Sequence, residues 1–362
     1  ANNYTIITTI GNSTNTALAG AASGGTVVVD ILSGTARAWN EPFIGSSTGV
    51  TQQLRLWSND NYGTDLVIAP RGGPIYYWVQ EDGVSTRAVE LSSLSVAPTY
   101  VPVATNQVIA SSIQQFVIAL GANSYVPGTP NTPFNPMIVR WSNQADPTNW
   151  VPEVTNQAGE FALTNGSYIV TGKTTRQEIL IWTDSCLYSM QYLGAPYVWG
   201  FNVLMDNISI MSPNAAVTVN NVTYWMGVDK FYMYSGRVET LPCALRQYVF
   251  NDINLDQNFQ VFAGSNEGYN EVWWFYCSTN TNTIDKYVIY NYVDRVWYYG
   301  TMARTAWLDS GIIQNPVAAD YNNRILNHEV GVDDAATSQV LPIPAYIQSS
   351  DFDIQDGHNF GF

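Results

Sequence analysis

A repeat of about 50 residues constrains this chain more than any other feature of its sequence. Each copy contains an apolar strand, a polar or glycine-rich turn, and a second strand that usually holds tyrosine. Equivalent positions on the first of these strands are Ile68, Ile118, Ile181, Tyr224, Trp273 and Ile325. The intervals between them are 50, 63, 43, 49 and 52 residues. Periods of roughly 40–50 residues with about four short strands each are typical of β-propeller blades. The sequence therefore predicts an all-β fold, a β-propeller of about six four-stranded blades.

The fourth copy of the repeat contains a complete blade. Its strands are expected at residues 215–219, 222–227, 230–235 and 237–241. The one long interval, 63 residues, is explained by the loop 121–136, which contains four prolines. A pair of β-sandwiches is the alternative, but sandwiches show alternation without a sustained period. Long loops in compact β domains are usually functional or disordered, so we predict that this loop contacts a partner.

The repeat does not extend over the whole chain. Residues 1–50 are rich in Thr, Ala, Gly and Ser, and 17–25 are of low complexity, so we expect a separate N-terminal β segment there. Residues 51–345 are assigned to the propeller. Residues 346–362 are expected to begin a further strand or domain. Because the last residues read as a strand cut in mid-run, we expect the chain to be a fragment of a longer polypeptide.

The charge of the chain argues against a nucleic-acid-binding protein. There are 14 Lys+Arg against 29 Asp+Glu, a net charge of −15, and the only lysines are Lys173, Lys230 and Lys286. Proteins that grip DNA need cations to displace counterions from phosphate. An acidic surface that DNA passes without sticking stays possible, because like charges repel. Charged residues make up only 12% of the chain, about half the usual fraction, which suits a surface covered by neighbouring subunits.

Residues for enzyme catalysis are scarce. His328 and His358 are the only histidines, and neither has the context of a catalytic triad. The three cysteines, Cys186, Cys243 and Cys277, are widely spaced, so buried free thiols are favoured over a zinc site or a disulfide framework. The sequence contains no run of 18 apolar residues, so none of its segments is predicted to span a membrane. We therefore predict that the chain is not an enzyme and assign no catalytic, cofactor-binding or metal-ligating residues.

Carboxylates and tryptophans are the residue types through which a propeller would cleave or bind glycans. Glycosidases use two carboxylates about 5–10 Å apart. The acidic residues here are interpreted as turn residues that bond their own backbone, and they are Asp60, Asp146, Asp184, Asp229 and Asp294. Trp182, Trp225 and Trp273 occupy equivalent blade positions and are interpreted as inter-blade core rather than sugar platforms.

One acidic segment has a pattern related to calcium loops. Residues 351–357 place carboxylates at alternate positions, as Ca²⁺ prefers, but they lack the EF-hand register and its terminal Glu. A strand with a solvated acidic edge is favoured there, and cation binding is left open.

Several segments of the chain resemble one protein family. They are residues 54–58 with 61–66, 70–73 with 75–78, 140–142 with 146–150, 175–184, 207–210 with 212–215, 263–276, 297–300 with 304–307, and 349–353. Taken together, these segments are similar to the tail nozzle, or tail tubular protein (tubular protein B-like), of short-tailed bacteriophages, the podoviruses. The resemblance covers roughly residues 51–362, and the first 50 residues have no match.

The resemblance implies a structural role in the virion. Proteins of this family form a hexameric ring, a tail nozzle or tail tube, below the portal and adaptor. The ring encloses the DNA ejection channel and anchors fibres or spikes, and the family has no catalytic residues to transfer. We therefore expect a virion protein made in the host cytoplasm that passes DNA without specific binding and contacts no membrane. The alternative is a carbohydrate-binding or glycan-cleaving β-propeller on a phage or bacterial surface.

Overall fold

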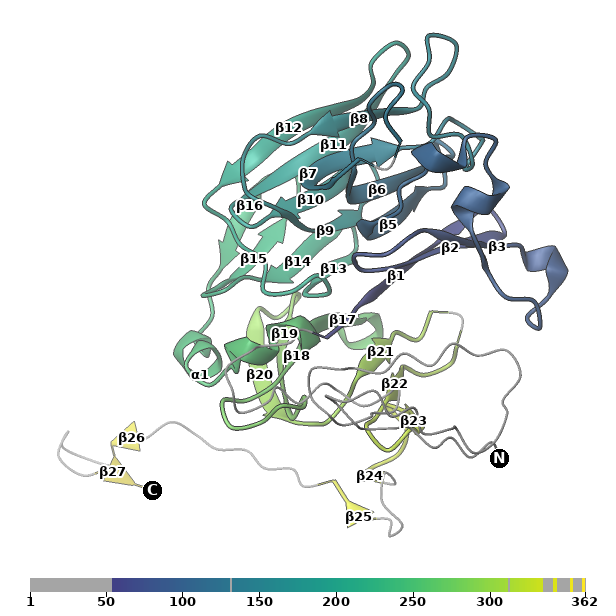
Figure 1. Cartoon of the computed structure of the whole chain (residues 1–362). Helices are drawn as coiled ribbons and strands as arrows, with labels where there is room; N and C mark the ends of the chain where they lie inside the picture. Colours follow the sequence, from purple (N-terminus) through teal and green to yellow (C-terminus); the bar gives the residue numbers. More distant parts are fainter. Residues whose placement is uncertain are drawn as a thin grey trace, which may run out of the picture.

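The chain folds as an all-β propeller in which successive sheets follow one another around a common centre (Figure 1). Five sheets have four antiparallel strands, and the described part of the sixth has three. The structure is a computed structural model, and it describes residues 54–130, 132–311, 313–334, 341–343, 352–353 and 360–361. The predicted fold class is confirmed.

The strands of each blade are consecutive in the chain. Blade 1 holds β1 (Trp57–Tyr62), β2 (Asp65–Pro70), β3 (Tyr76–Trp78) and β4 (Val89–Glu90). Blade 2 holds β5 (Thr105–Ser111), β6 (Phe116–Asn123), β7 (Phe134–Trp141) and β8 (Gly159–Ala162). Blade 3 holds β9 (Ile169–Thr174), β10 (Ile179–Thr183), β11 (Cys186–Gly194) and β12 (Val198–Asp206). Blade 4 holds β13 (Ala216–Val219), β14 (Val222–Met226), β15 (Phe231–Tyr234) and β16 (Val238–Leu241).

The last sheets continue the same order. Blade 5 holds β17 (Phe262–Asn266), β18 (Glu271–Tyr276), β19 (Lys286–Asn291) and β20 (Val296–Thr301). Blade 6 holds β21 (Ala306–Leu308), β22 (Val317–Ala319) and β23 (Ile325–Asn327). Two hairpins follow, β24 (Asp333–Asp334) with β25 (Leu341–Pro342) and β26 (Phe352–Asp353) with β27 (Phe360–Gly361).

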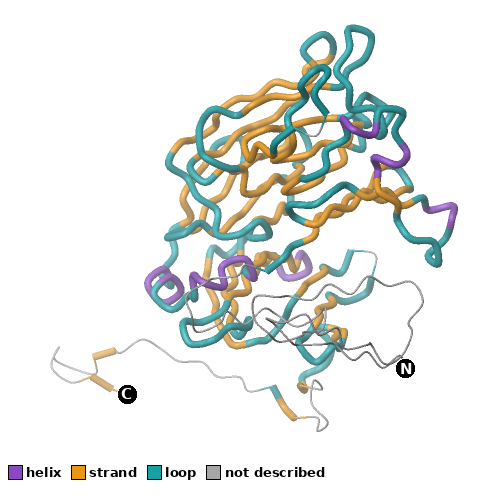
Figure 2. Tube along the Cα trace, viewed as in Figure 1, coloured by secondary structure: helices purple, strands orange, loops and turns teal. Residues whose placement is uncertain are grey.

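Helical structure is confined to short pieces between strands (Figure 2). They are α1 (Arg246–Phe250) and the 3-10 turns η1 (Gln80–Asp82), η2 (Leu91–Leu94), η3 (Pro98–Tyr100), η4 (Leu255–Gln260) and η5 (Glu267–Tyr269). Among the described residues, none of these helices has the length and apolar character needed to cross a membrane.

Local sequence explains the tight hairpins of blade 4. Asn220 and Asn221 separate β13 from β14 and have φ values of 48° and 65°. A two-residue hairpin with a type I′ turn needs positive φ at both positions, and asparagine tolerates that conformation better than most residues. All four predicted strand boundaries of this blade are confirmed to within one residue.

The first strand of each sheet lies nearest the axis. β1 lies beside β5, β5 beside β9, β13 beside β17 and β17 beside β21. Because strands in a blade are antiparallel, the segments entering these inner strands and the loops between second and third strands share one end of the axis. We call this end the entry face. The fourth strands form the outer rim.

The hydrophobic core lies between blades. Trp182 of β10 and Trp225 of β14 meet edge to face at 5.3 Å across the gap between blades 3 and 4. Trp273 of β18 stacks at 5.1 Å on Trp307 of β21. The predicted core role of Trp182, Trp225 and Trp273 is therefore confirmed. The three blade positions are not fully equivalent, because Trp225 faces the preceding blade whereas Trp182 and Trp273 face the following blade. A shift of one residue along a strand reverses the face of the side chain.

The position chosen for the sixth repeat was wrong by one strand. Ile325 lies on β23, the third strand of its blade, and is 79% exposed. The second strand is β22, whose central residue Ala318 is buried. This strand has three residues with small side chains, so its apolar signal was weaker than that of the next strand.

The predicted domain limits fall largely outside the described residues. The sheets of the propeller extend from Trp57 to Asn327, within the predicted 51–345. Residues 1–50 and most of 346–362 belong to the part of the chain that is not described.

Candidate functional site at the propeller axis and on blade 5

Arg71 reaches across the entry face from the turn between β2 and β3. Its Nη1 donates to the carbonyl oxygens of Val170 at 3.0 Å and Asn106 at 3.4 Å. Its guanidinium lies 5.5 Å from the ring centre of Phe259, which precedes β17. These partners belong to blades 2 and 3 and to the segment entering blade 5, so the side chain lies over the axis. Burial lowers the pKa of Arg71.

The turn that carries Arg71 depends on two glycines. Gly72 has φ of 76°, a conformation that favours glycine. A Cβ on Gly73 would lie 2.7 Å from Cγ of Pro70, so a larger residue would displace the turn. The segment Pro70-Arg71-Gly72-Gly73 thus contains both the side chain over the axis and the backbone that positions it.

Side chains near the axis tie the inner strands together. Gln107 of β5 donates to the Gly172 carbonyl at 2.8 Å and accepts from the Gly172 amide at 2.7 Å. Thr171 donates to Pro213 O at 2.8 Å, which joins blade 3 to the start of blade 4. Ser212 in turn donates to the Val261 carbonyl at the start of blade 5. These polar groups act as inter-blade connections.

Asp60 and Lys173 are the ionisable pair of the inner strands. Asp60 accepts a hydrogen bond from the Ala110 amide at 2.9 Å, so it links β1 to β5. Burial lowers the pKa of Lys173 on β9, and the charge of Asp60 partly opposes that shift. The prediction that Asp60 occupies a turn was wrong, because it lies within β1 and the chain reverses only after Tyr62.

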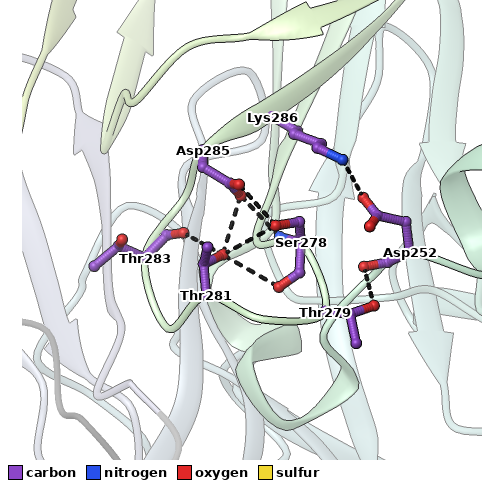
Figure 3. Close-up of polar contacts among 7 residues, drawn as sticks. All are labelled: Asp252, Ser278, Thr279, Thr281, Thr283, Asp285 and Lys286. Carbon is purple, nitrogen blue, oxygen red and sulfur yellow. Dashed lines mark hydrogen bonds and ion pairs between the residues drawn. The ribbon is translucent and has the colours of Figure 1, made fainter.

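A polar cluster occupies the loop between β18 and β19 (Figure 3). Asp285 accepts from the Ser278 amide at 2.8 Å and from the hydroxyls of Ser278 and Thr281 at 2.7 and 3.1 Å. Lys286 forms an ion pair with Asp252 at 2.8 Å. Both carboxylates of this cluster are therefore engaged by donors, and these contacts connect the loop to the segment that follows α1.

A second pair of carboxylates meets between blades 5 and 6, at the end opposite the entry face. Asn266 donates to Glu329 at 3.1 Å, and Trp273 donates to Glu271 at 3.0 Å. Burial first, and then the charge of Glu329, raise the pKa of Glu271. Two carboxylates in unequal environments can divide the roles of acid and base, so this pair is the best candidate for chemistry. Sequence spacing gave no signal for it, since the two residues are 58 positions apart.

The histidine of this region is held by neighbouring side chains. His328 lies 4.8 Å from Trp307 and accepts a hydrogen bond from Arg304 at 3.0 Å. Burial and the Arg304 charge lower the pKa of His328 to about 4. His358 lies outside the described residues.

The remaining sequence predictions have separate outcomes. The three cysteines are free thiols, as predicted, and Cys186 and Cys277 are buried, but Cys243 is only partly buried. Asp146 bonds the Thr148 amide at 3.0 Å, as expected of a turn aspartate, and Asp184 bonds Ser167 in a neighbouring loop. Asp229 pairs with Arg246 at 3.1 Å.

Among the described residues, no group of three or more His, Cys, Asp or Glu side chains could hold a metal ion. The acidic segment 351–357 lies outside the described residues, apart from the strand residues 352–353.

The proline-rich loop is fastened to blade 2. Arg140, 2% exposed, donates to the carbonyls of Asn123, Tyr100 and Trp150, each at 2.9 Å. Asn123 donates to the Thr132 carbonyl at 2.7 Å, across the base of the loop. The role of this loop as a partner contact stays a prediction.

No protein-family model matches the chain, and no curated protein matches its sequence. Solved structures give loose likenesses of the fold. Hsv2 of Kluyvelomyces marxianus is 8% identical with a TM-score of 0.40, covering 81% of this chain and 78% of that chain. BamB from Moraxella catarrhalis is 13% identical with a TM-score of 0.39, covering 83% and 77%. A chain of the mitotic checkpoint complex is 10% identical with a TM-score of 0.44, covering 85% and 82%. At these TM-scores the likeness transfers no function to this chain.

Proposed function

We propose that this chain is a virion structural protein, a subunit of a ring-shaped tail nozzle or tail tube through which DNA leaves the particle. In this role it contacts further copies of itself, adaptor-side tail proteins, and fibres or spikes. DNA passes through the assembled ring and not through the propeller. The DNA binds at no specific site of the ring.

The observation that carries the proposal is where the segments resembling nozzle proteins lie in the fold. Residues 70–73 contain the axial Arg71 and its turn, and residues 212–215 contain the connection from blade 4 to blade 5. Residues 263–276 form β17 and β18, and 304–307 include Trp307 at the junction of blades 5 and 6. Four of these segments therefore include residues that hold the blades together, as expected where family members share a scaffold.

The charge of the chain also supports the proposal. A net charge of −15 per subunit, multiplied around a ring, repels the phosphate backbone and opposes binding. Charge reversal of carboxylates that line the channel should therefore slow DNA ejection and raise DNA retention. Unchanged ejection after such reversal would contradict this part of the proposal.

Electron microscopy of purified phage particles tests the assignment directly. Antibody against this chain should label a ring on the tail axis at the distal end. Label on side spikes or on the capsid, or no label at all, would contradict the nozzle role.

The glycan-cleaving alternative has one observation in its favour, the position of Glu271 near Glu329, whose charge together with burial raises the pKa of Glu271. Glu271→Gln and Glu329→Gln should each abolish hydrolysis of capsule oligosaccharides if this alternative holds. Absence of any hydrolysis by the unaltered chain would exclude it.

A further inference from the structure

Blade 6 differs from the other blades at its outer rim. Blades 1 to 5 each have four strands in the order of the chain, whereas the described strands of blade 6 are β21, β22 and β23. Within the described residues, β23 pairs with β22 alone, so its other edge has no neighbouring strand. Ile325 of β23 is 79% exposed, and Leu308, on the same face of this sheet, is 64% exposed. A blade built like the other five needs one further strand beside β23.

The backbone of β23 presents hydrogen-bonding groups at this edge. The Arg324 carbonyl accepts from the Asp320 amide at 3.0 Å, and the His328 amide donates at 2.8 Å to the residue that precedes β22. Successive residues of an antiparallel strand direct their backbone groups to alternate sides. The even-numbered residues therefore face β22, and the backbone groups of Ile325 and Asn327 point toward the position of a fourth strand. An edge of this kind pairs readily with an added strand.

The chain that follows β23 does not supply this strand. Glu329 has φ of 57° and accepts a hydrogen bond from Asn266 at 3.1 Å, so the chain turns inward to the end of β17 in blade 5. The next strand, β24, pairs with β25 in a hairpin of its own. The strand beside β23 must therefore come from another segment.

The connections between blades favour a segment that precedes β1. In blades 1 to 5 the fourth strand is antiparallel to the third, so it ends at the entry face and leads into the inner strand of the next blade. Going around the axis, blade 1 follows blade 6, and its inner strand β1 begins at the same face. A strand upstream of Trp57 that runs antiparallel to β23 also ends at the entry face. It therefore enters β1 by the same kind of connection as in the other blades.

Residues 26–32 have the composition of such a strand. Their sequence is TVVVDIL, with a single charge, and β-branched residues favour strands. Val27, Val29 and Ile31 alternate along the segment, so in a strand they share one face. This apolar face matches the face of blade 6 that contains Ile325, and such a match sets the register of a strand.

The length of the chain before β1 suits this position. Residues 33–56 would connect the strand to β1, and they are close in number to residues 242–261, which connect β16 to β17. Fully extended, they reach up to about 80 Å. The four strands of a blade span only about 15 Å. Because the segment is tethered to β1, its effective concentration at β23 is on the order of millimolar, which favours it over the same segment of another copy.

We propose that residues 26–32 form the fourth strand of blade 6, antiparallel to β23 of the same chain. The pairing fastens the last blade to the segment that enters the first blade, so it closes the propeller. The inference goes beyond the proposed nozzle function and does not depend on it.

Photo-crosslinking of the full chain identifies the segment beside β23. Benzoylphenylalanine replaces Ile325, and mass spectrometry identifies the captured peptide, which should contain residues 26–32. The same probe in place of Val154, a fully exposed loop residue, is the control and should not capture this peptide. In a mixture of nitrogen-15-labelled and unlabelled chains, each crosslinked pair should carry one isotope. Capture of residues 4–10, of residues after 334, of a peptide from another copy, or of no segment would overturn the proposal.

Hydrogen exchange followed by NMR tests the backbone pairing. In the unaltered chain the amides of Ile325 and Asn327 should exchange slowly. Val28→Pro with Val29→Pro should speed their exchange by roughly tenfold or more, because one of two adjacent prolines faces β23 in any register and cannot pair. The matched control, Ala21→Pro with Ala22→Pro in the low-complexity run, should leave their exchange unchanged. Fast exchange in the unaltered chain, or the same effect from both pairs of prolines, would also overturn the proposal.

Discussion

Replacing Arg71 tests whether one side chain over the axis holds several blades together. Arg71→Met removes the charge-assisted bond to the Val170 carbonyl at 3.0 Å and leaves that buried acceptor without its donor. A hydrogen bond from a charged group contributes about 1.5–3 kcal/mol. Loss of the contact over Phe259 adds about 0.5–2 kcal/mol. The methionine recovers part of the packing, so we expect a destabilisation of roughly 2–4 kcal/mol.

The assay is thermal unfolding followed by circular dichroism. At about 2–4 °C per kcal/mol, the midpoint should fall by roughly 4–16 °C. Arg87→Met is the matched control, because Arg87 is exposed, and it should change stability by less than about 0.5 kcal/mol. Arg71→Lys keeps the charge but not the planar fork, so its midpoint should lie between those of Met and Arg. If Arg71→Met unfolds at the same temperature as Arg87→Met, the axial role is refuted.

Three further predictions concern the core, the histidine and the thiols. Trp274→Ala should lower the free energy of unfolding by about 3–5 kcal/mol, because the fully buried indole packs between blades 4 and 5. In the same urea titrations the control Trp57→Ala, at a half-exposed side chain, should lower it far less. The pKa of His328 in the folded chain is about 4, below the ordinary value of 6.5, so the stability that neutral His328 contributes is complete above pH 6.5 and is lost as the pH falls toward 4. Carbon-13 NMR of labelled histidine should measure that pKa, and a value near 6.5 would contradict the burial of His328. Ellman's reagent should label fewer than about one thiol in the folded chain and three after denaturation. Burial raises the pKa of Cys243 to about 11 and that of Cys277 to about 12, and Cys186 is buried. Rapid labelling of all three thiols in the native state would contradict this prediction.

Much of the fold was predictable because propeller blades are local structures. Each blade is a run of consecutive antiparallel strands joined by short turns, so its signal is contained within about 50 residues. Asn220 and Asn221 identify a tight hairpin without reference to the rest of the chain. The prediction failed where the local signal was weak, at β22, whose three small residues were passed over in favour of Ile325.

The candidate sites were much less predictable. Pro70-Arg71-Gly72-Gly73 could be read as a turn, but nothing in the sequence indicated that Arg71 would meet carbonyls of Asn106 and Val170. Glu271 and Glu329 come together only because blades 5 and 6 are neighbours. Which strands lie on the outer rim was also not predictable, because it depends on the order of strands in each sheet.

The sequence by itself determined the class of fold, the spacing of the blades and the charge balance, because these depend on local patterns and on composition. Tertiary structure alone decided which residues meet at the axis, which carboxylates pair and which edges face solvent. The physical reason is that hydrogen bonds, ion pairs and burial between blades join residues tens to more than a hundred positions apart. Their partners are selected by how the sheets pack around the axis.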